Sequence, residues 1–183
     1  PTLLTTNDGG NTILALSYLS RWDGPVFEED DRFPASTYPD DVVYRELDAE
    51  YHLQNAVFIP NRTSYTDNDK IKEAVVKYGA LYGTFAVNYD CFDYNSRTYY
   101  CPTYIDPVDG GHAVAIVGWD DNYSKSNFEY TPPGNGAFIC KNSWGTESGY
   151  NGYFYISYYD SSIGNRDIMT AYTGLEKADN YDK

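Results

Sequence analysis

The sequence predicts an α+β fold in which a short helical part precedes a larger, antiparallel, barrel-like sheet. Two observations support this prediction. Apolar residues recur at helical spacing in two segments of the first half, whereas the second half alternates short apolar runs with clusters of Gly, Pro, Asn and Asp. A length of 183 residues suits one domain, or two small lobes sharing an interface, and allows a substantial core.

The helical part begins with a helix that is expected to be capped near Asn11. Its apolar residues follow at helical intervals: Ile13, Leu16, Leu19 and Trp22. Residues 24–51 are acidic and contain several prolines, which favour extended or turn backbone. This stretch is therefore predicted to cross the surface without regular structure.

The sheet part is predicted to begin with a strand over residues 55–59 and a helix ended by Gly79. Asp67 or Asp69 is expected to cap this helix. Its predicted apolar side consists of Ile71, Val75 and Val76. Further strands are predicted over 81–89, 113–119, 137–141 and 152–158. We expect residues 1–54 to be the remainder of a helical lobe and residues 55–183 to form the sheet lobe.

Composition excludes several classes of function. The 13 Lys and Arg against 27 Asp and Glu give a formal net charge of -14, which repels nucleic acids and anionic lipid surfaces. No stretch approaches the roughly 20 apolar residues that span a bilayer, and the first residues lack an apolar signal core. Two glycosylation sequons, at Asn61 and Asn122, favour a secreted or cell-surface protein.

Three cysteines are present, and an odd number leaves at least one thiol free. Cys91 and Cys101 flank a turn-like segment, so a hairpin would bring them within bridging distance. A disulfide and two free thiols are both open on the sequence alone. Cys140 lies inside a predicted strand and is expected to be a buried, small apolar residue. Two histidines without clustered Cys/His spacing predict neither a metal site nor a cofactor.

Two segments place polar residues beside predicted strands. One is Gly-Gly-His-Ala-Val-Ala-Ile-Val-Gly-Trp-Asp over 110–120, and the other is Lys-Asn-Ser-Trp-Gly-Thr over 141–146, followed by Gly-Tyr-Asn-Gly-Tyr-Phe over 149–154. Taken singly, His112 is more often a structural residue and Asn-Ser-Trp-Gly an ordinary turn. Together, in this order and spacing, the segments resemble the papain-like cysteine peptidases, whose similarity extends over roughly residues 7–174.

The resemblance implies a two-lobe papain-like fold and peptide-bond hydrolysis by Cys-His-Asn chemistry. A thiol with a pKa of about 8.5 is mostly protonated at neutral pH, and a neighbouring imidazolium favours the thiolate. His112 would pair with the thiolate and protonate the leaving amine. The Asn142 side chain would orient the imidazole, and Trp144 would shield that hydrogen bond from water.

The same resemblance implies the substrate-binding residues for a peptide or protein. Gly9 and Gly10 correspond to a glycine pair whose backbone pairs with an extended peptide. Gly111 would continue this cleft with a backbone acceptor. Thr84 and Ala113, with Tyr172 nearby, would lie beside the pocket for the second residue before the cleaved bond.

One departure from the family concerns the nucleophile. Family members carry a Gln and a Cys-Trp pair upstream of the glycine pair, and this sequence contains no such segment. We expect the cysteine on an associated N-terminal chain or segment, either in an enzyme cleaved into two chains or in a longer peptidase of which this is a fragment. The chain by itself is then expected to be inactive. The alternative is a non-catalytic peptide-binding or structural homologue that has lost the thiol.

Overall fold

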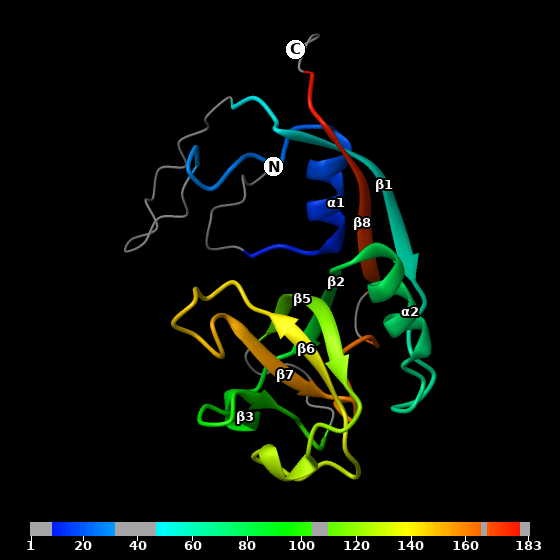
Figure 1. The fold of residues 1–183 in the computed structure, drawn as a ribbon, viewed down its shortest axis with the longest axis vertical. Coiled ribbons are helices and arrows are strands. Elements are labelled where there is room, and N and C mark those ends of the chain that lie inside the picture. The colour runs from blue at the N-terminus through cyan, green and yellow to red at the C-terminus, as the bar shows by residue number, and fades with distance from the viewer. Residues whose placement is uncertain (1–8, 32–46, 104–109, 166–167, 180–183) are drawn as a thin grey trace. The chain divides into compact units, whose positions relative to one another are not determined.

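The structure, a computed structural model, describes residues 9–31, 47–103, 110–165 and 168–179. The chain divides into two compact units, one of residues 1–56 with 173–183 and the other of residues 57–172. The second unit contains most of the sheet and both of the segments singled out from the sequence (Figure 1). No helix among the described residues is long and apolar enough to cross a membrane.

The strands form an eight-stranded sheet in the order β1-β8-β2-β5-β6-β7-β4-β3. Their bounds are β1 Tyr51–Ile59, β2 Leu81–Ala86, β3 Phe92–Asp93, β4 Thr98–Tyr99, β5 Gly111–Asp120, β6 Ala137–Lys141, β7 Tyr153–Ser157 and β8 Met169–Lys177. Neighbours from β2 through β5 and β6 to β7 pair antiparallel, whereas β4 pairs with β7 in parallel. The predicted α+β class is confirmed.

Helix α1 spans Thr12–Ser20 and begins as the sequence predicts. The Asn11 side chain accepts a hydrogen bond from the Leu14 backbone N–H at 3.0 Å, which satisfies one of the free donors at the helix start. Beyond the helix, the Trp22 indole donates to the Leu53 carbonyl at 2.9 Å and stacks on His52 with ring centroids 4.6 Å apart. Trp22 therefore fastens the end of this helical segment to β1.

Helix α2 spans Asp69–Tyr78, but its capping differs from the prediction. Asn68, not Asp67 or Asp69, occupies the cap position, and its side chain makes no capping hydrogen bond. Asp67 instead accepts from the Thr63 backbone N–H and hydroxyl at 2.9 and 2.7 Å, because this polar loop needs its own acceptor. The helix ends before Gly79 at φ 86°, as expected of a glycine stop.

The buried side of α2 is shifted from the predicted one. Ile71 and Ala74 are buried against the sheet, whereas Val76 is 76% exposed. Because Ile71, Ala74 and Val75 share one face of a 3.6-residue period, Val76 falls a further 100° around the helix axis. The helix packs against β2 and β5 through this face.

Several strand boundaries also differ from the prediction. β1 starts at Tyr51, four residues earlier, so the irregular crossing ends sooner. β2 ends at Ala86, because Asn88 caps a 3-10 turn over Tyr89–Cys91 by accepting from the Asp90 backbone N–H at 2.9 Å. The long β8 was not predicted, and β3 and β4 were anticipated only as a hairpin between Cys91 and Cys101, without strand bounds. A two-residue strand lacks a usable periodicity, and β8 contains an interior Gly174.

The core of the second unit lies between α2 and the sheet. Its fully buried members come from α2 and six different strands, so it joins segments far apart in the sequence. They include Ile71, Leu81, Phe85, Ile116, Phe138, Cys140 and Ile156. Phe85 also makes an edge contact with Tyr99 at 4.8 Å between ring centroids. This packing fixes the positions of the ends of β2, β5 and β6.

A bulge interrupts the pairing of β5 with β6. Ile116 lies opposite Cys140, but Gly118 lies opposite Ile139, so one extra residue is inserted in β5. Side chains alternate between faces along a strand, and the insertion reverses that alternation. His112, Val114 and Ile116 consequently share the core-facing side with Trp119, which packs against the core cluster.

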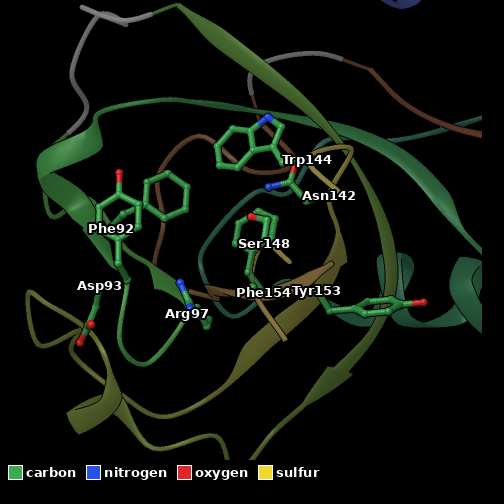
Figure 2. A pocket seen from close by; sticks show the side chains of 10 residues that line it. Phe92, Asp93, Arg97, Asn142, Trp144, Ser148, Tyr153 and Phe154 are labelled. Atoms are coloured by element: carbon green, nitrogen blue, oxygen red, sulfur yellow. The ribbon is translucent and has the colours of Figure 1, made fainter. Parts of the chain in front are cut away.

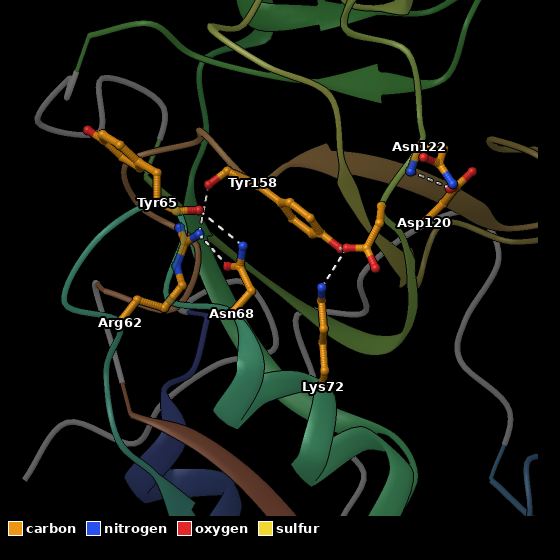
Figure 3. Close-up of polar contacts among 8 residues, drawn as sticks. Arg62, Tyr65, Asn68, Lys72, Asp120, Asn122 and Tyr158 are labelled. Carbon is orange, nitrogen blue, oxygen red and sulfur yellow. Dashed lines mark hydrogen bonds and ion pairs between the residues drawn. The ribbon is translucent and has the colours of Figure 1, made fainter.

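A buried guanidinium organises the loops around the end of β7. Arg62 is 6% exposed and donates to the carbonyls of Tyr158, Asp160 and Ile163 at 2.7 to 2.8 Å and to the Asn68 amide oxygen at 3.1 Å. Figure 3 shows Arg62 with Asn68 and Tyr158 in this network. Burial lowers the pKa of Arg62, and the nearby Asp160 carboxyl opposes that effect. Arg62 thus supplies donors that buried carbonyls require.

Replacing this guanidinium is expected to destabilise the fold. Arg62→Ala leaves several buried carbonyls without donors, and we expect the free energy of unfolding to fall by on the order of 3 kcal/mol. Arg21→Ala is the matched control, because Arg21 is 68% exposed in an ion pair with Asp23 and should cost less than about 1 kcal/mol. Denaturant unfolding measures both. Equal losses of unfolding free energy for the two variants would show that the buried hydrogen bonds of Arg62 stabilise the fold no more than an exposed ion pair does.

Candidate active site

His112 is the second residue of β5 and lies at the edge of the core. It pairs in register with Phe85 of β2, whose ring meets the imidazole edge-on with centroids 5.8 Å apart. Val114 and Ile116, on the same face of the strand, are buried and anchor it. The core therefore holds the backbone of His112, while its ring stays half-buried at the surface.

Asn142 follows β6 directly and faces the same side of the sheet as Cys140. Its Oδ1 lies 2.8 Å from His112 Nε2, and it also accepts from the Ser143 backbone N–H at 2.8 Å. The Asn142 backbone N–H donates to the Gly152 carbonyl at 2.8 Å, which fixes the turn. Since an amide oxygen only accepts, Nε2 carries the proton in this contact.

The protonated Nε2 leaves the other ring nitrogen for chemistry. His112 Nδ1 has no hydrogen-bond partner within residues 9–31, 47–103, 110–165 and 168–179. A neutral imidazole of this tautomer presents a lone pair at Nδ1. Such a nitrogen accepts a proton from a thiol or hydroxyl and returns it to a leaving group.

Trp144 covers the contact between His112 and Asn142. Its indole stacks on the imidazole with centroids 4.9 Å apart and ring planes 30° apart. Trp144 remains 43% exposed, so one side of the indole faces solvent while the other covers the imidazole. The predicted arrangement of these three side chains is confirmed, and Figure 2 shows Trp144 and Asn142 next to each other.

Each of the three cysteines has a structural place that excludes it as a nucleophile. Cys91 and Cys101 form a disulfide with Cα atoms 5.2 Å apart, which settles the alternative left open by the sequence. Cys140 is fully buried and free, as predicted. Burial raises the pKa of the Cys140 thiol, so it stays protonated and inaccessible. The imidazole therefore has no reactive thiol partner in this sequence.

The predicted substrate-binding residues fall into two groups. Thr84 pairs in register with Ala113, and Gly111 precedes His112 on β5. Ala113 lines a hollow together with Tyr82, Lys141, Asn142 and Tyr172, among others. Thr84 is half-buried, and its Oγ1 is a buried polar atom without a hydrogen-bond partner. The strand pairing thus places Thr84 and Ala113 side by side, one residue from His112.

Gly9 and Gly10 belong to the other compact unit, in the segment before α1. A Cβ built on either glycine would meet no atom within 4 Å. None of the described residues therefore fills the space beside the Cα of either glycine. Gly9 has φ 68°, a conformation that favours glycine. Their role in binding a peptide stays a prediction.

Sequence reasoning missed a second hollow, which is lined in part by Trp144. It is lined by Phe92, Arg97, Trp144, Tyr153 and Phe154, with Asn142 at its border (Figure 2). The hairpin of β3 and β4 supplies Phe92 and Arg97. The signal available in the sequence was the turn between Cys91 and Cys101, which predicted a hairpin but not which of its side chains face the site.

Comparison with known proteins identifies relatives whose similarity covers most of this chain. A family model described as papain family cysteine protease matches residues 5–173. Pro-cathepsin H of Mus musculus is 32% identical over 152 residues, which cover 81% of this chain and 40% of that protein.

Two solved structures are also similar to this chain. The cysteine protease and lectin-like domains of Cwp84, a surface layer associated protein of Clostridium difficile, are 31% identical with a TM-score of 0.77, over 96% of this chain and 38% of that one. Procathepsin L2 of Tenebrio molitor shares the fold with a TM-score of 0.61 at 21% identity, over 91% of this chain and 48% of that one. The chain therefore spans less than half the length of these relatives.

The cysteine assignments predict the result of thiol counting. Alkylation of the denatured, unreduced protein is expected to modify one thiol, that of Cys140, and alkylation after reduction is expected to modify three. In the folded protein, Cys140 should resist alkylation because it is fully buried. Mass spectrometry of the alkylated chain checks all three counts. Three modified thiols without reduction would contradict the disulfide.

Proposed function

Because the chain belongs to the papain family of cysteine proteases, we propose that it forms the His/Asn-bearing portion of a cysteine endopeptidase whose nucleophile lies outside this sequence. The observation that carries the proposal is the 2.8 Å contact between His112 Nε2 and Asn142 Oδ1 beneath the Trp144 ring. A peptide-binding module has no need for an oriented imidazole with a free Nδ1.

In the proposed mechanism, His112 Nδ1 faces the thiol of the incoming cysteine. Proton transfer from sulfur to Nδ1 gives a thiolate and an imidazolium, and the thiolate attacks the peptide carbonyl. The imidazolium then donates its Nδ1 proton to the leaving amine as the carbon–nitrogen bond breaks. Asn142 holds the ring plane through both steps, and Trp144 limits competition from water for that hydrogen bond.

The nucleophile and an oxyanion donor are proposed to come from an associated N-terminal chain or segment. The described structure supports this in two ways. All three cysteines of the chain are bridged or buried. Helix α1 exposes large apolar side chains that a partner segment would cover, with Ile13 61%, Leu14 43% and Tyr18 42% exposed. Residues 1–54 would then belong to the same helical lobe as that segment, and residues 55–183 would form the sheet lobe that carries His112 and Asn142.

The substrate is proposed to be an extended peptide segment of a protein. Its residues before the cleaved bond would run along Gly111, and the backbone of Gly9 and Gly10 is proposed to pair with an extended peptide. Thr84 and Ala113, neighbours across the β2–β5 pairing, would border one side-chain position. The space where a Cβ would stand on either glycine is free of the described residues, which supports a close approach by a peptide.

A secreted or cell-surface location is proposed for the enzyme. The disulfide between Cys91 and Cys101 is typical of oxidising compartments, and the two sequons agree with that environment. Asn122 of the second sequon is exposed, as glycosylation requires.

Reconstitution tests the proposal. The chain alone is expected to cleave no unstructured protein, and its combination with the Cys-bearing segment should gain activity that a thiol alkylator abolishes. Native mass spectrometry of the mixture establishes whether the two pieces associate. Alkylator-resistant activity of the chain by itself would contradict the mechanism. A reconstituted pair that binds peptide without cutting it would favour the non-catalytic homologue.

Substitutions in the pair should separate proton transfer from orientation. In the reconstituted enzyme, His112→Ala is expected to lower kcat/KM by about 10³-fold, because proton transfer to and from sulfur is lost. Asn142→Ala should cost less, since the imidazole remains but is free to rotate. Asn122→Ala is the matched control on an exposed loop and should leave kcat/KM unchanged. Steady-state kinetics on one peptide compares them. A larger loss for Asn142→Ala than for His112→Ala would reverse the assigned roles.

A further inference from the structure

The hollow beside Trp144 combines aromatic walls with one cation. Phe92, Trp144 and Phe154 form its walls, and Arg97 lines it from the β3–β4 hairpin. The ring of Phe92 lies near both others, with centroids 6.3 Å from Trp144 and 5.9 Å from Phe154. In Figure 2 the Arg97 side chain lies between Phe92 and Phe154. The hollow therefore holds a guanidinium in partly apolar surroundings.

The charge of Arg97 is unpaired. Its side chain is half-buried and makes no ion pair or hydrogen bond with any residue that the structure describes. Asp93 lines the same hollow, but its Oδ1 accepts from the backbone N–H groups of Asn95 and Ser96 at 2.8 and 3.1 Å. These hydrogen bonds lower the pKa of Asp93, and Figure 2 shows its carboxylate pointing away from the rings. In a chain of net charge -14, a half-buried cation without a partner is a candidate anion site.

The backbone holds Arg97 in place at some cost. Arg97 has φ 54°, a conformation that glycine adopts more easily than residues with a side chain. Its carbonyl accepts from the Tyr155 backbone N–H at 3.0 Å, which ties the turn to β7. The disulfide between Cys91 and Cys101 closes the base of the same hairpin. A glycine would adopt this turn conformation at lower cost. The presence of an arginine at this position therefore suggests that its side chain has a function.

The hollow also has a defined place relative to the His112–Asn142 pair. Asn142 borders two hollows, one lined by Ala113 and Tyr172 and the other by Trp144 and Arg97. The two hollows therefore adjoin at Asn142, the hydrogen-bond partner of His112. If the acyl part of a peptide lies along Ala113, the part released as the amine crosses the pair toward Trp144. Arg97 then meets the leaving-group side of the substrate.

We propose that Arg97 is a specificity-determining residue that binds a carboxylate on the leaving-group side of the cleaved peptide. This inference rests on the proposed function. Guanidinium–carboxylate contacts are charge-assisted and well matched in shape, and the aromatic walls reduce competition from water. Ser148 lines the same hollow and offers a hydroxyl as a second donor. The carboxylate belongs either to an Asp or Glu side chain or to the C-terminus of the substrate.

Binding of product-like peptides tests the proposal without requiring catalysis. The probes are Asp-Ala-Ala-amide and Ala-Asp-Ala-amide with their Asn counterparts, and Ala-Ala as free acid and as amide. NMR titration of the 15N-labelled chain, followed at the Arg97 side-chain N–H, gives each Kd. At least one carboxylate peptide should bind about tenfold more tightly than its neutral counterpart. Asp peptides and the free acid distinguish a side chain from a chain end.

Variants assign the preference to Arg97. Arg97→Gly suits the turn backbone and should remove the tenfold preference, whereas Arg97→Lys should keep part of it. Lys70→Gln removes the same charge from α2, lines neither hollow and should leave the preference intact. For these variants, backbone amide shifts around Trp144 report binding. Equal Kd values for all carboxylate and neutral pairs, or a preference that survives in Arg97→Gly, would overturn the proposal.

Cleavage by the reconstituted enzyme separates this inference from the function on which it rests. Peptides with Asp in the first or second position after the cleaved bond should show about tenfold higher kcat/KM than the Asn versions, and Arg97→Gly should abolish the difference. Absence of any cleavage with preserved binding preference would overturn the enzyme assignment and support the carboxylate site. Cleavage that ignores the charge would leave the enzyme assignment standing and overturn the role of Arg97.

Discussion

The pairing of β5 with β6 is the constraint on which the site depends. Ala115 lies opposite Lys141 and Ile116 opposite Cys140, so His112 and Asn142 become diagonal neighbours on the same face as the strands leave the sheet. Diagonal neighbours are too distant for short side chains but within reach of an imidazole and an amide. The 2.8 Å contact between them follows from this register. A slip by one residue would turn one partner to the opposite face.

The bulge in β5 lets this strand keep the register described above and still turn Trp119 toward the core. Without the extra residue, a strand that turns His112, Val114 and Ile116 inward would turn Trp119 outward. Trp119 instead packs against the core cluster, and β6 keeps Phe138 and Cys140 fully buried. The bulge thus allows the same ten residues to carry His112 at the candidate site and to contribute Val114, Ile116 and Trp119 to the core. Core packing holds the backbone of His112, and the hydrogen bond to Asn142 orients its ring.

The three cysteines of this chain have two different structural places, a disulfide and a buried free thiol. The free thiol is placed where burial keeps it protonated, and the other two close a hairpin that carries Phe92 and Arg97 to the border of the site. The hairpin is short, and two-residue strands have little stability of their own. The disulfide and the parallel pairing of β4 with β7 hold it in position. All three cysteines of the chain therefore have structural places, two in a disulfide and one in the core.

The sequence by itself determined the elements whose signals are local. Asn11 capped the helix that it was predicted to cap, and the apolar runs around His112 and before Asn142 became strands. The resemblance of the two motifs, in their order and spacing, to papain-like peptidases predicted that His112, Asn142 and Trp144 meet. Only the tertiary structure decided the bulge, the disulfide and the hollow around Arg97. Each of these depends on which distant backbone lies opposite, and neither side-chain periodicity nor turn composition specifies that partner.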